Sequence, residues 1–196
     1  MPDFFESMQR SYVDVPVGAN DYIDVQEFLE ATESLTKLFD SMGAAFGPVK
    51  SDLLGNVAKL RTRYTENPTK NKTLQELVIT ERAEGKKTAT EGLLWLKRGL
   101  EFTSKGLRRN LNDKNEELNV SFTKAYEETL SKHHSFMVRP VFSLAMKACP
   151  YRKEFYAKLG SDEAKVQAEE EKWLAALERI VAILNAFYKQ GGYEKL

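Results

Sequence analysis

Three polar side chains with complementary hydrogen-bonding chemistry share one face of a predicted helix. Asp52, Asn56 and Lys59 stand at positions i, i+4 and i+7 of one amphipathic segment, so they form a row along a helix. The carboxylate accepts hydrogen bonds, the amide accepts and donates, and the ammonium donates. This row suits an uncharged ligand rich in hydroxyls, such as a sugar, whereas a phosphate would favour arginines. The alternative is an ordinary polar stripe that faces water.

A tryptophan later in the chain offers an aromatic surface beside such a row. Trp95 is followed at once by Leu96, Lys97 and Arg98. The face of a sugar ring carries C–H groups and can stack on an indole, although a tryptophan in a helical stripe can equally belong to the core. Lys97 and Arg98 are expected either to be solvated or to snorkel, with their stems along apolar surface and their charged ends in water.

A histidine is the third candidate for ligand binding, and it too can instead belong to the core. His134 stands four and eight residues after Leu130 and Tyr126, so a continuous helix would put all three on one stripe. A histidine there needs a polar partner, which can be a neighbour in the core or the carbonyl of a ligand. Acid and base catalysis by His134 and Asp52 is a further option. No Gly-x-Ser-x-Gly nucleophile motif supports it.

Composition excludes several classes of function. The chain has 196 residues, 42% hydrophobic and 30% charged, which predicts one domain over residues 1–196 with an amino-terminal extension at residues 1–20. The 29 basic and 29 acidic residues balance, so no net field favours nucleic acid. We expect no metal or cofactor, because the sequence has no metal-ligand cluster and no phosphate loop. The single cysteine, Cys149, is interpreted as a packing residue.

The same survey predicts a cytosolic protein. The amino terminus has no signal-peptide pattern, and no stretch approaches the roughly 18 apolar residues of a membrane span.

Helical periodicity dominates the chain and predicts an all-α fold. Capping-box spacing places helix starts near Asp24, Thr73 and Thr88. The expected helices cover residues 48–64, 88–107 and 162–190, with a helical pattern from residue 118 that is broken at Pro140 and Pro150, and a loop at 110–117. The sum is about eight helices. A two-layer helical sandwich could hold an apolar ligand between its layers, although a dry core would give the same periodicity.

Several motifs together resemble the glycolipid transfer protein family, and fungal members in particular. They are Asp52-x-x-x-Asn56-x-x-Lys59, the run Trp95-Leu96-Lys97-Arg98-Gly99-Leu100, Lys124-Ala125-Tyr126-Glu127, His134, and Cys149-Pro150-Tyr151. They follow the family's order at similar separations, and the resemblance covers residues 24–193.

The resemblance implies a protein that transfers glycosphingolipids between membranes and is not an enzyme. Asp52 would accept from the ceramide amide and a sugar hydroxyl, while Asn56 and Lys59 would bond further hydroxyls. Trp95 would stack on the first sugar, and His134 would donate to the ceramide carbonyl. The implied ligand is glucosylceramide, galactosylceramide or lactosylceramide, with its chains in an apolar pocket of the two-layer helical sandwich that the resemblance also implies.

Two further residues have less defined roles in this resemblance. Tyr151 is expected near the head group. Phe136 stands where animal members usually have a tryptophan associated with membrane contact, so it is our candidate for transient contact with a membrane surface. The tail from Gly191 onward matches the family poorly.

Alternatives of other classes stay open at this point. The related branch that carries ceramide phosphate uses basic residues where this chain has Asn56 and Trp95, so these two residues favour sugar. An enzyme acting on the lipid would need a pair of carboxylates, which the sequence does not define. A lipid sensor or helical interaction protein would need the same pocket as a carrier.

Overall fold

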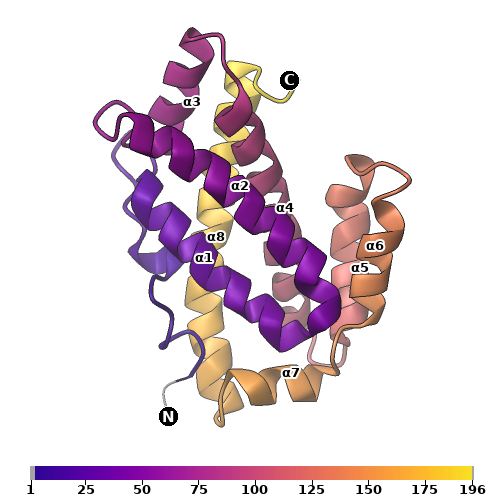
Figure 1. The fold of residues 1–196 in the computed structure, drawn as a ribbon. Coiled ribbons are helices and arrows are strands. Elements are labelled where there is room, and N and C mark those ends of the chain that lie inside the picture. Colours follow the sequence, from indigo (N-terminus) through magenta and orange to yellow (C-terminus); the bar gives the residue numbers. More distant parts are fainter. Residues whose placement is uncertain (1–2, 196) are drawn as a thin grey trace.

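The helices of the computed structural model, which describes residues 3–195, pack in two layers (Figure 1). They are α1 (Val25–Met42), α2 (Gly47–Glu66), α3 (Leu74–Ala83), α4 (Thr88–Asn112), α5 (Leu118–Glu128), α6 (Arg139–Lys147), α7 (Arg152–Leu159) and α8 (Glu163–Gly191). In the view of Figure 1, α1 and α2 lie in front of α4 and α8, α5 and α6 stand to one side, and α7 crosses the lower end. The all-α prediction of about eight helices is confirmed for the described residues.

Helix α4 lies at the centre of the packing and contacts α2, α3, α5 and α8. Its glycines let neighbouring helices approach closely. A Cβ placed on Gly106 would lie 2.7 Å from the ring of Phe122 on α5, closer than packed carbon atoms come to one another. Any larger residue at position 106 would therefore push α5 away from α4.

The amino-terminal residues join the same apolar core. The rings of Phe5 and Tyr12 lie 5.5 and 5.6 Å from that of Trp173 on α8, and all three side chains are buried. The backbone N–H of Phe4 also donates to the carbonyl of Leu159 at the end of α7. The described part of the predicted extension is thus packed against α7 and α8.

Two of the three predicted helix starts carry the expected caps. Asp24 accepts a hydrogen bond from the backbone of Glu27, and Thr73 and Glu76 form a reciprocal capping box. The third helix begins at Thr88 as predicted but without the capping box, because Thr88 is already the first residue of α4 and the residue before it, Lys87, makes no side-chain cap bond.

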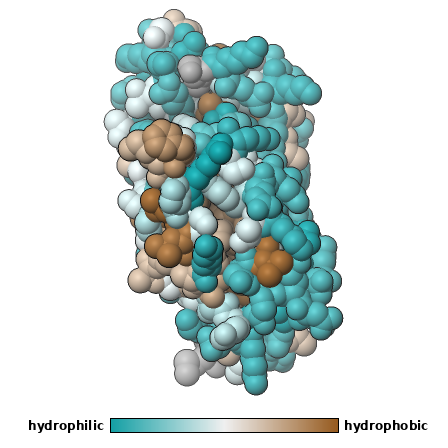
Figure 2. Space-filling model, turned by 90° about the vertical axis from the view of Figure 1, so that its right-hand side faces the viewer, coloured by the Kyte–Doolittle hydropathy of each residue, from teal (hydrophilic) through white to brown (hydrophobic). Residues whose placement is uncertain are grey.

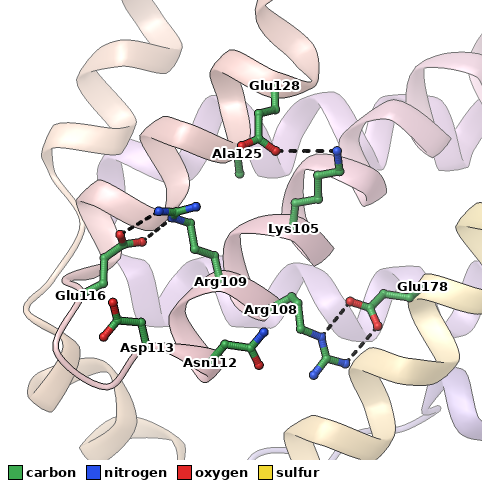
Figure 3. Close-up of a pocket in the computed structure, with 9 residues that line it drawn as sticks. All are labelled: Lys105, Arg108, Arg109, Asn112, Asp113, Glu116, Ala125, Glu128 and Glu178. Carbon is green, nitrogen blue, oxygen red and sulfur yellow. Dashed lines mark hydrogen bonds and ion pairs between the residues drawn. The ribbon is translucent and has the colours of Figure 1, made fainter.

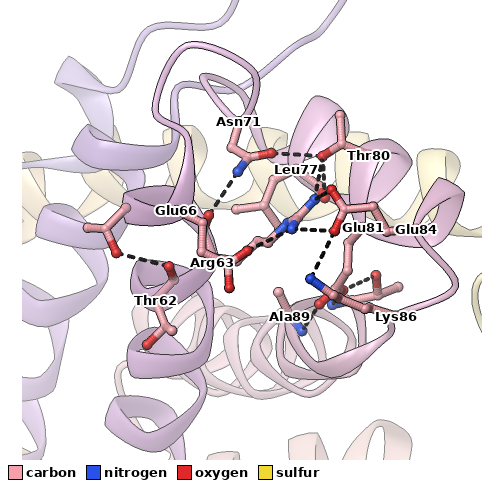
Figure 4. Close-up of polar contacts among 12 residues, drawn as sticks. Thr62, Arg63, Glu66, Asn71, Leu77, Thr80, Glu81, Glu84, Lys86 and Ala89 are labelled. Carbon is pink, nitrogen blue, oxygen red and sulfur yellow. Dashed lines mark hydrogen bonds and ion pairs between the residues drawn. The ribbon is translucent and has the colours of Figure 1, made fainter.

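The start of α4 is capped from another helix instead. The carboxylate of Glu81, on α3, accepts from the backbone N–H groups of Ala89 and Thr90 at 2.9 and 2.7 Å (Figure 4). A carboxylate at this end satisfies donors that no helical carbonyl can reach, and it opposes the positive end of the helix dipole. Glu81 is 2% exposed, so this cap belongs to the core.

The segment after α5 departs from the predicted helix. Helix α5 ends at Glu128, a 3-10 turn covers Leu130–Lys132, and His134 lies in the following turn. The prediction that Tyr126 and His134 share one stripe of a single helix was therefore wrong. Pro140 does mark a boundary, because it stands in the first turn of α6.

The predicted loop at 110–117 is shorter than expected. Helix α4 continues to Asn112, and Asn110 is buried, with its amide donating to the carbonyl of Glu116. The carboxylate of Glu116 in turn accepts from Arg109 and Lys124. Polar residues read as a surface loop thus close the corner between α4 and α5.

Candidate ligand-binding site

The predicted polar row lies on α2 as expected, and its members position one another. The side-chain nitrogen of Asn56 donates to the backbone carbonyl of Asp52 at 3.0 Å, and Nζ of Lys59 donates to Oδ1 of Asn56 at 3.1 Å. Asn56 is buried, whereas Asp52 and Lys59 reach the surface. Within the described residues no hydrogen bond engages the Asp52 carboxylate, so it can accept bonds from a ligand.

The surroundings of Asp52 make its carboxyl group a weaker acid. Partial burial of the carboxylate raises its pKa above the ordinary value, and the nearby charge of Lys59 opposes that rise. A carboxylate that is partly desolvated before a ligand arrives loses less hydration when it accepts the ligand's hydrogen bonds.

Two glycines bring α4 close to this row. A Cβ on Gly92 would lie 3.2 Å from side-chain atoms of Lys59, and one on Gly99 would lie 3.3 Å from Leu53. Residues 92 and 99 of α4 thus face residues 59 and 53 of α2, so the two helices run in opposite directions. Trp95 lies between the two contacts on α4, as Asn56 does on α2. Trp95 and Asn56 are therefore at the same level along the contact of α4 with α2.

Trp95 is half-buried and is not a core residue. Its ring stacks near that of His134, with centroids 5.9 Å apart and planes 22° from parallel, and it meets His133 edge-on at 6.5 Å. The guanidinium carbon of Arg98 lies 5.0 Å from the centre of the indole. Of the two alternatives predicted for Arg98, solvated or snorkelling, its half-burial against Trp95 favours the second, and this partial burial lowers the pKa of Arg98.

His134 is held by a residue that sequence reasoning did not assign to the site. The Tyr126 hydroxyl and Nδ1 of His134 are 3.1 Å apart. Burial lowers the pKa of His134, and the charge of Arg139 adds to the effect, which favours the neutral imidazole. When Tyr126 donates to Nδ1, the proton of the neutral ring is on Nε2, which can then donate to a ligand. Helical spacing was no signal for Tyr126, because α5 ends at Glu128 and the turn after it brings His134 back to the Tyr126 hydroxyl.

Lys97, the other basic residue near Trp95 in the sequence, has a structural role. Its charged end was expected in water under either alternative, but its side chain is only 4% exposed. Its Nζ donates to Asn185 of α8 at 2.8 Å, lies over the ring of Tyr188 at 5.4 Å, and stands 3.8 Å from Glu194. The prediction was wrong because α8 and the tail after it cover this face of α4.

Tyr151 is not brought to the cluster of Trp95 and His134. It is 69% exposed and precedes α7, and the backbone N–H of the next residue donates to Glu117 at the start of α5. His134 lies past the opposite end of that helix. Eleven residues of α5 correspond to about 16 Å, so a role for Tyr151 near the head group stays a prediction.

Phe136 lies on an apolar surface around α6. Its side chain is 82% exposed, and Met137 and Leu144 are 70% and 65% exposed. Val138 and Val141 are also exposed. Figure 2, which faces the side of the molecule formed by α5 and α6, shows hydrophobic side chains gathered over part of that face. We call Phe136, Met137, Val138, Val141 and Leu144 the α6 apolar surface.

A separate groove of about 430 Å³ lies between α4, α5 and α8 (Figure 3). Its two arginines are neutralised, because Arg108 forms two hydrogen bonds to Glu178 and Arg109 forms two to Glu116. These bonds hold the helices together and leave neither guanidinium as a free phosphate ligand.

Known proteins resemble this chain over most of its length. The family model described as glycolipid transfer protein matches residues 23–161. A curated glycolipid transfer protein from Aureobasidium melanogenum is 56% identical over 185 residues, covering 94% of this chain and 92% of that protein. The pleckstrin homology domain-containing family A member 8 of Mus musculus is 34% identical over 208 residues, which cover 99% of this chain and 40% of that longer protein.

Solved structures give the same relationship. The crystal structure of HET-C2, a fungal glycolipid transfer protein, superposes with a TM-score of 0.94 at 52% identity, covering 98% of this chain and all of that one. A structure of FAPP2, described as selecting simple glycosphingolipids, gives 0.91 at 34% identity and covers 99% of this chain and 98% of that one. Mouse ceramide-1-phosphate transfer protein gives 0.89 at 18% identity, with both chains fully covered, which shows a shared fold alone.

Proposed function

The chain belongs to the glycolipid transfer protein family, and we propose that it binds one simple glycosphingolipid and carries it between membranes without vesicles. Two observations support this proposal most directly: the close contact of α2 and α4, which puts Trp95 and Asn56 at the same level along the two helices, and the stacking of His134 near Trp95. A carboxylate, an amide and an ammonium next to an aromatic face can recognise an uncharged sugar.

We assign the roles within the site as follows. Asp52 accepts from the ceramide amide and from a sugar hydroxyl, and Asn56 and Lys59 bond other hydroxyls. Trp95 stacks on the first sugar. The Nε2–H of His134 donates to the ceramide carbonyl while Tyr126 holds the opposite side of the ring. These contacts select the head group, since a lipid without hydroxyls would leave the polar row unpaired.

A glycosphingolipid needs a carrier because its hydrocarbon chains are costly to expose to water. Each methylene exposed to water costs about 0.8 kcal/mol, so a chain of about sixteen costs on the order of 13 kcal/mol. Aromatic side chains from three helices, Phe102, Phe122, Tyr126 and Phe142, pack on one another behind His134. We propose that the chains enter the core on this side, between α4, α5 and α6.

Membrane contact is proposed for the α6 apolar surface. Phe136 is the aromatic member of this surface and its most exposed residue. The chain has a formal net charge of zero, so contact through apolar side chains fits better than a polybasic patch, and it stays weak and reversible. None of the helices in the described range 3–195 is long and apolar enough to cross a membrane. We propose that the protein works at the cytosolic surface of membranes.

The test is a transfer assay between donor and acceptor vesicles. Fluorescent glucosylceramide and galactosylceramide are compared with ceramide phosphate and phosphatidylcholine, using the wild-type protein and Asp52→Val. We expect transfer of the two glycolipids only, with at least a tenfold loss in the variant, since a charge-assisted hydrogen bond contributes roughly 1.5–3 kcal/mol. Equal transfer of all four lipids, or a folded variant as fast as the wild type, would reject the proposal.

The same assay separates carrier from sensor. A sensor takes glucosylceramide out of donor vesicles, and the lipid stays on the protein. A carrier delivers many lipids per protein molecule to the acceptor vesicles.

A further inference from the structure

Residues 129–153 carry a local positive charge, although the chain as a whole carries none. This segment contains five basic residues and no acidic one, whereas the whole chain has 29 of each. It includes the turn before α6 and all of α6. The charge of the chain is therefore unevenly distributed, and the α6 apolar surface lies in its positive part.

One serine in this segment has the charge pattern that a basophilic kinase selects. Ser135 stands three residues after Lys132, with two histidines between them, and no acidic residue precedes it nearer than Glu128. Kinases distinguish their substrates in part by such charge patterns, because an acidic cleft pairs with a base upstream of the serine.

The structure distinguishes Ser135 from the other residues that have this spacing. A serine or threonine follows a basic residue by three positions at Thr62, Thr73, Thr90, Ser135 and Ser161. The three threonines lie in helices or cap one, and their hydroxyls are hydrogen-bonded. Ser161 is exposed but is followed by two acidic residues. Ser135 is exposed and lies outside the helices, and its hydroxyl forms no hydrogen bond within residues 3–195.

The backbone around Ser135 is weakly tied to the rest of the fold. The N–H groups of residues 135–137 donate to no backbone carbonyl in the described part of the chain. The carbonyl of Ser135 accepts from Val138 and Arg139 at the start of α6. A kinase must draw its target serine into a cleft, and few backbone bonds break when it does so here.

Two cations beside Ser135 are placed to hold a phosphate. Nε of Arg139 donates to the carbonyls of Ser131 and His134 at 3.0 and 3.1 Å, so its guanidinium lies against the backbone just before Ser135. Among residues 3–195, no acidic side chain forms an ion pair with Arg139 or Lys132. A phosphoserine carries about two negative charges and three acceptor oxygens, which a guanidinium binds well.

We propose that Ser135 is a phosphorylation site for a basophilic serine kinase, and that the phosphate weakens the contact of the α6 apolar surface with membranes. In the transfer step the Ser135 hydroxyl oxygen attacks the γ-phosphorus of ATP. The new O–P bond forms as the bond to the leaving ADP breaks, and a base of the kinase takes the hydroxyl proton. The effect on membranes rests on the proposed function, whereas the modification itself does not.

The phosphate acts on the membrane contact through its charge. It is attached one residue before Phe136, and a charged group does not follow that ring into an apolar layer. The anionic head groups of a membrane also repel it. Each charge near such a surface changes partition about fivefold, so a doubly charged phosphate predicts at least a tenfold loss. The protein then leaves the membrane and transfer slows.

The first test asks whether the folded protein is modified at Ser135. The wild type, Ser135→Ala and Lys132→Ala are incubated with ATP and a kinase of the cyclic-AMP-dependent class, and phosphate is located by peptide mass spectrometry. We expect phosphate on Ser135 in the wild type and a rate roughly tenfold lower for Lys132→Ala, which removes a charge pair with the kinase. An unmodified Ser135, or an equal rate for Lys132→Ala, would overturn the assignment.

The second test measures the consequence for membrane binding. Partition onto vesicles of phosphatidylcholine and phosphatidylserine is compared for the unmodified and the phosphorylated protein, Ser135→Asp and Ser161→Asp. Ser161 is the matched control, because it is also exposed and outside the helices but joins α7 to α8. We expect at least a tenfold loss with the phosphate, roughly fivefold with Ser135→Asp, and no change with Ser161→Asp. Equal effects of the two substitutions would contradict a local action on α6.

The outcomes distinguish this switch from the proposed function. If phosphorylated and unmodified protein bind vesicles and transfer glucosylceramide equally well, the switch is rejected and the carrier stands. If the unmodified protein transfers no glycolipid, the proposed function is rejected, while the mass spectrum still decides whether Ser135 is a kinase site.

Discussion

The two tryptophans of the chain occupy contrasting environments, which allows a matched comparison at the scale of single residues. Trp95 is half-buried at the level of Asn56 on α2, whereas Trp173 is 1% exposed and packs against Phe5 and Tyr12. The same substitution at the two positions should therefore affect different properties.

We predict that Trp95→Ala lowers glycolipid transfer at least tenfold and leaves the free energy of unfolding within roughly 1.5 kcal/mol of the wild type, because it removes a stacking surface more than a core contact. Trp173→Ala should lower the free energy of unfolding by roughly 3–5 kcal/mol. Vesicle transfer and denaturant unfolding measure the two effects. If Trp95→Ala unfolds the protein and transfer per folded molecule is unchanged, Trp95 is a core residue.

Sequence patterns predicted some of these residues better than others. The row of Asp52, Asn56 and Lys59 depends only on helical spacing, and the structure places it as predicted. The burial of Lys97 depends on Asn185 and Glu194, which are about ninety residues away in the chain. No local pattern carries that information.

At the scale of elements, α4 depends on a cap that lies outside its own sequence. Glu81 of α3 accepts from Ala89 and Thr90 and is buried. We predict that Glu81→Ala lowers the free energy of unfolding by roughly 2–4 kcal/mol, since it leaves buried helix donors unpaired. Denaturant unfolding gives the value. The control is Glu91→Ala, because Glu91 forms only a surface ion pair with Lys87 and should change stability by less than about 1 kcal/mol. Equal effects of the two substitutions would argue against the cap.

The contact of α7 with α8 contains a buried carboxyl group. Glu170 is fully buried, and one of its oxygens accepts from the Tyr156 hydroxyl at 2.9 Å. Burial raises the pKa of Glu170 to about 7, although the Tyr156 hydrogen bond, Arg152 and Arg108 oppose the rise.

The folded state therefore holds this proton at higher pH than the unfolded chain does. The resulting stability is fully present below about pH 4.5 and is lost as the pH rises through about 7. We predict that Glu170→Gln becomes more stable relative to the wild type over this window, by on the order of 3 kcal/mol. Urea unfolding of both proteins at several pH values measures the difference. A difference that does not vary with pH would contradict the account.

The bounds of some helices were predicted more accurately than those of others. Helices α2 and α8 have long regular stripes, and their observed bounds fall within two residues of the prediction. The end of α5 was missed because Leu130 and His134 continue the helical spacing although the backbone has turned at Thr129. Tertiary contacts of His134 with Tyr126 and Phe142 stabilise that turn.

At the scale of the whole molecule, the proposed head-group site and the α6 apolar surface lie on adjoining parts of the chain, because His134 is two residues from Phe136. A lipid leaving a bilayer could thus meet the polar row while α6 rests on the membrane. The sequence predicted Phe136 and its apolar neighbours as contacts, and the structure shows that Val141 and Leu144 of α6 are exposed as well.

We predict that Phe136→Ala lowers the partition of the protein onto neutral vesicles roughly fivefold, because it removes about 1 kcal/mol of apolar contact. Ile79→Ala, at an exposed apolar side chain on α3, is the control and should leave partition unchanged. Vesicle sedimentation measures both. Unchanged partition of Phe136→Ala would remove Phe136 from the membrane contact.

The most direct test of the central claim is native mass spectrometry after incubation with mixed vesicles that contain glucosylceramide, ceramide phosphate and phosphatidylcholine. The account predicts one glucosylceramide per chain on the wild-type protein and none on Asp52→Val. Bound ceramide phosphate or phosphatidylcholine at a similar level, or glucosylceramide retained in full by Asp52→Val, would contradict a sugar-selective site on α2 and α4.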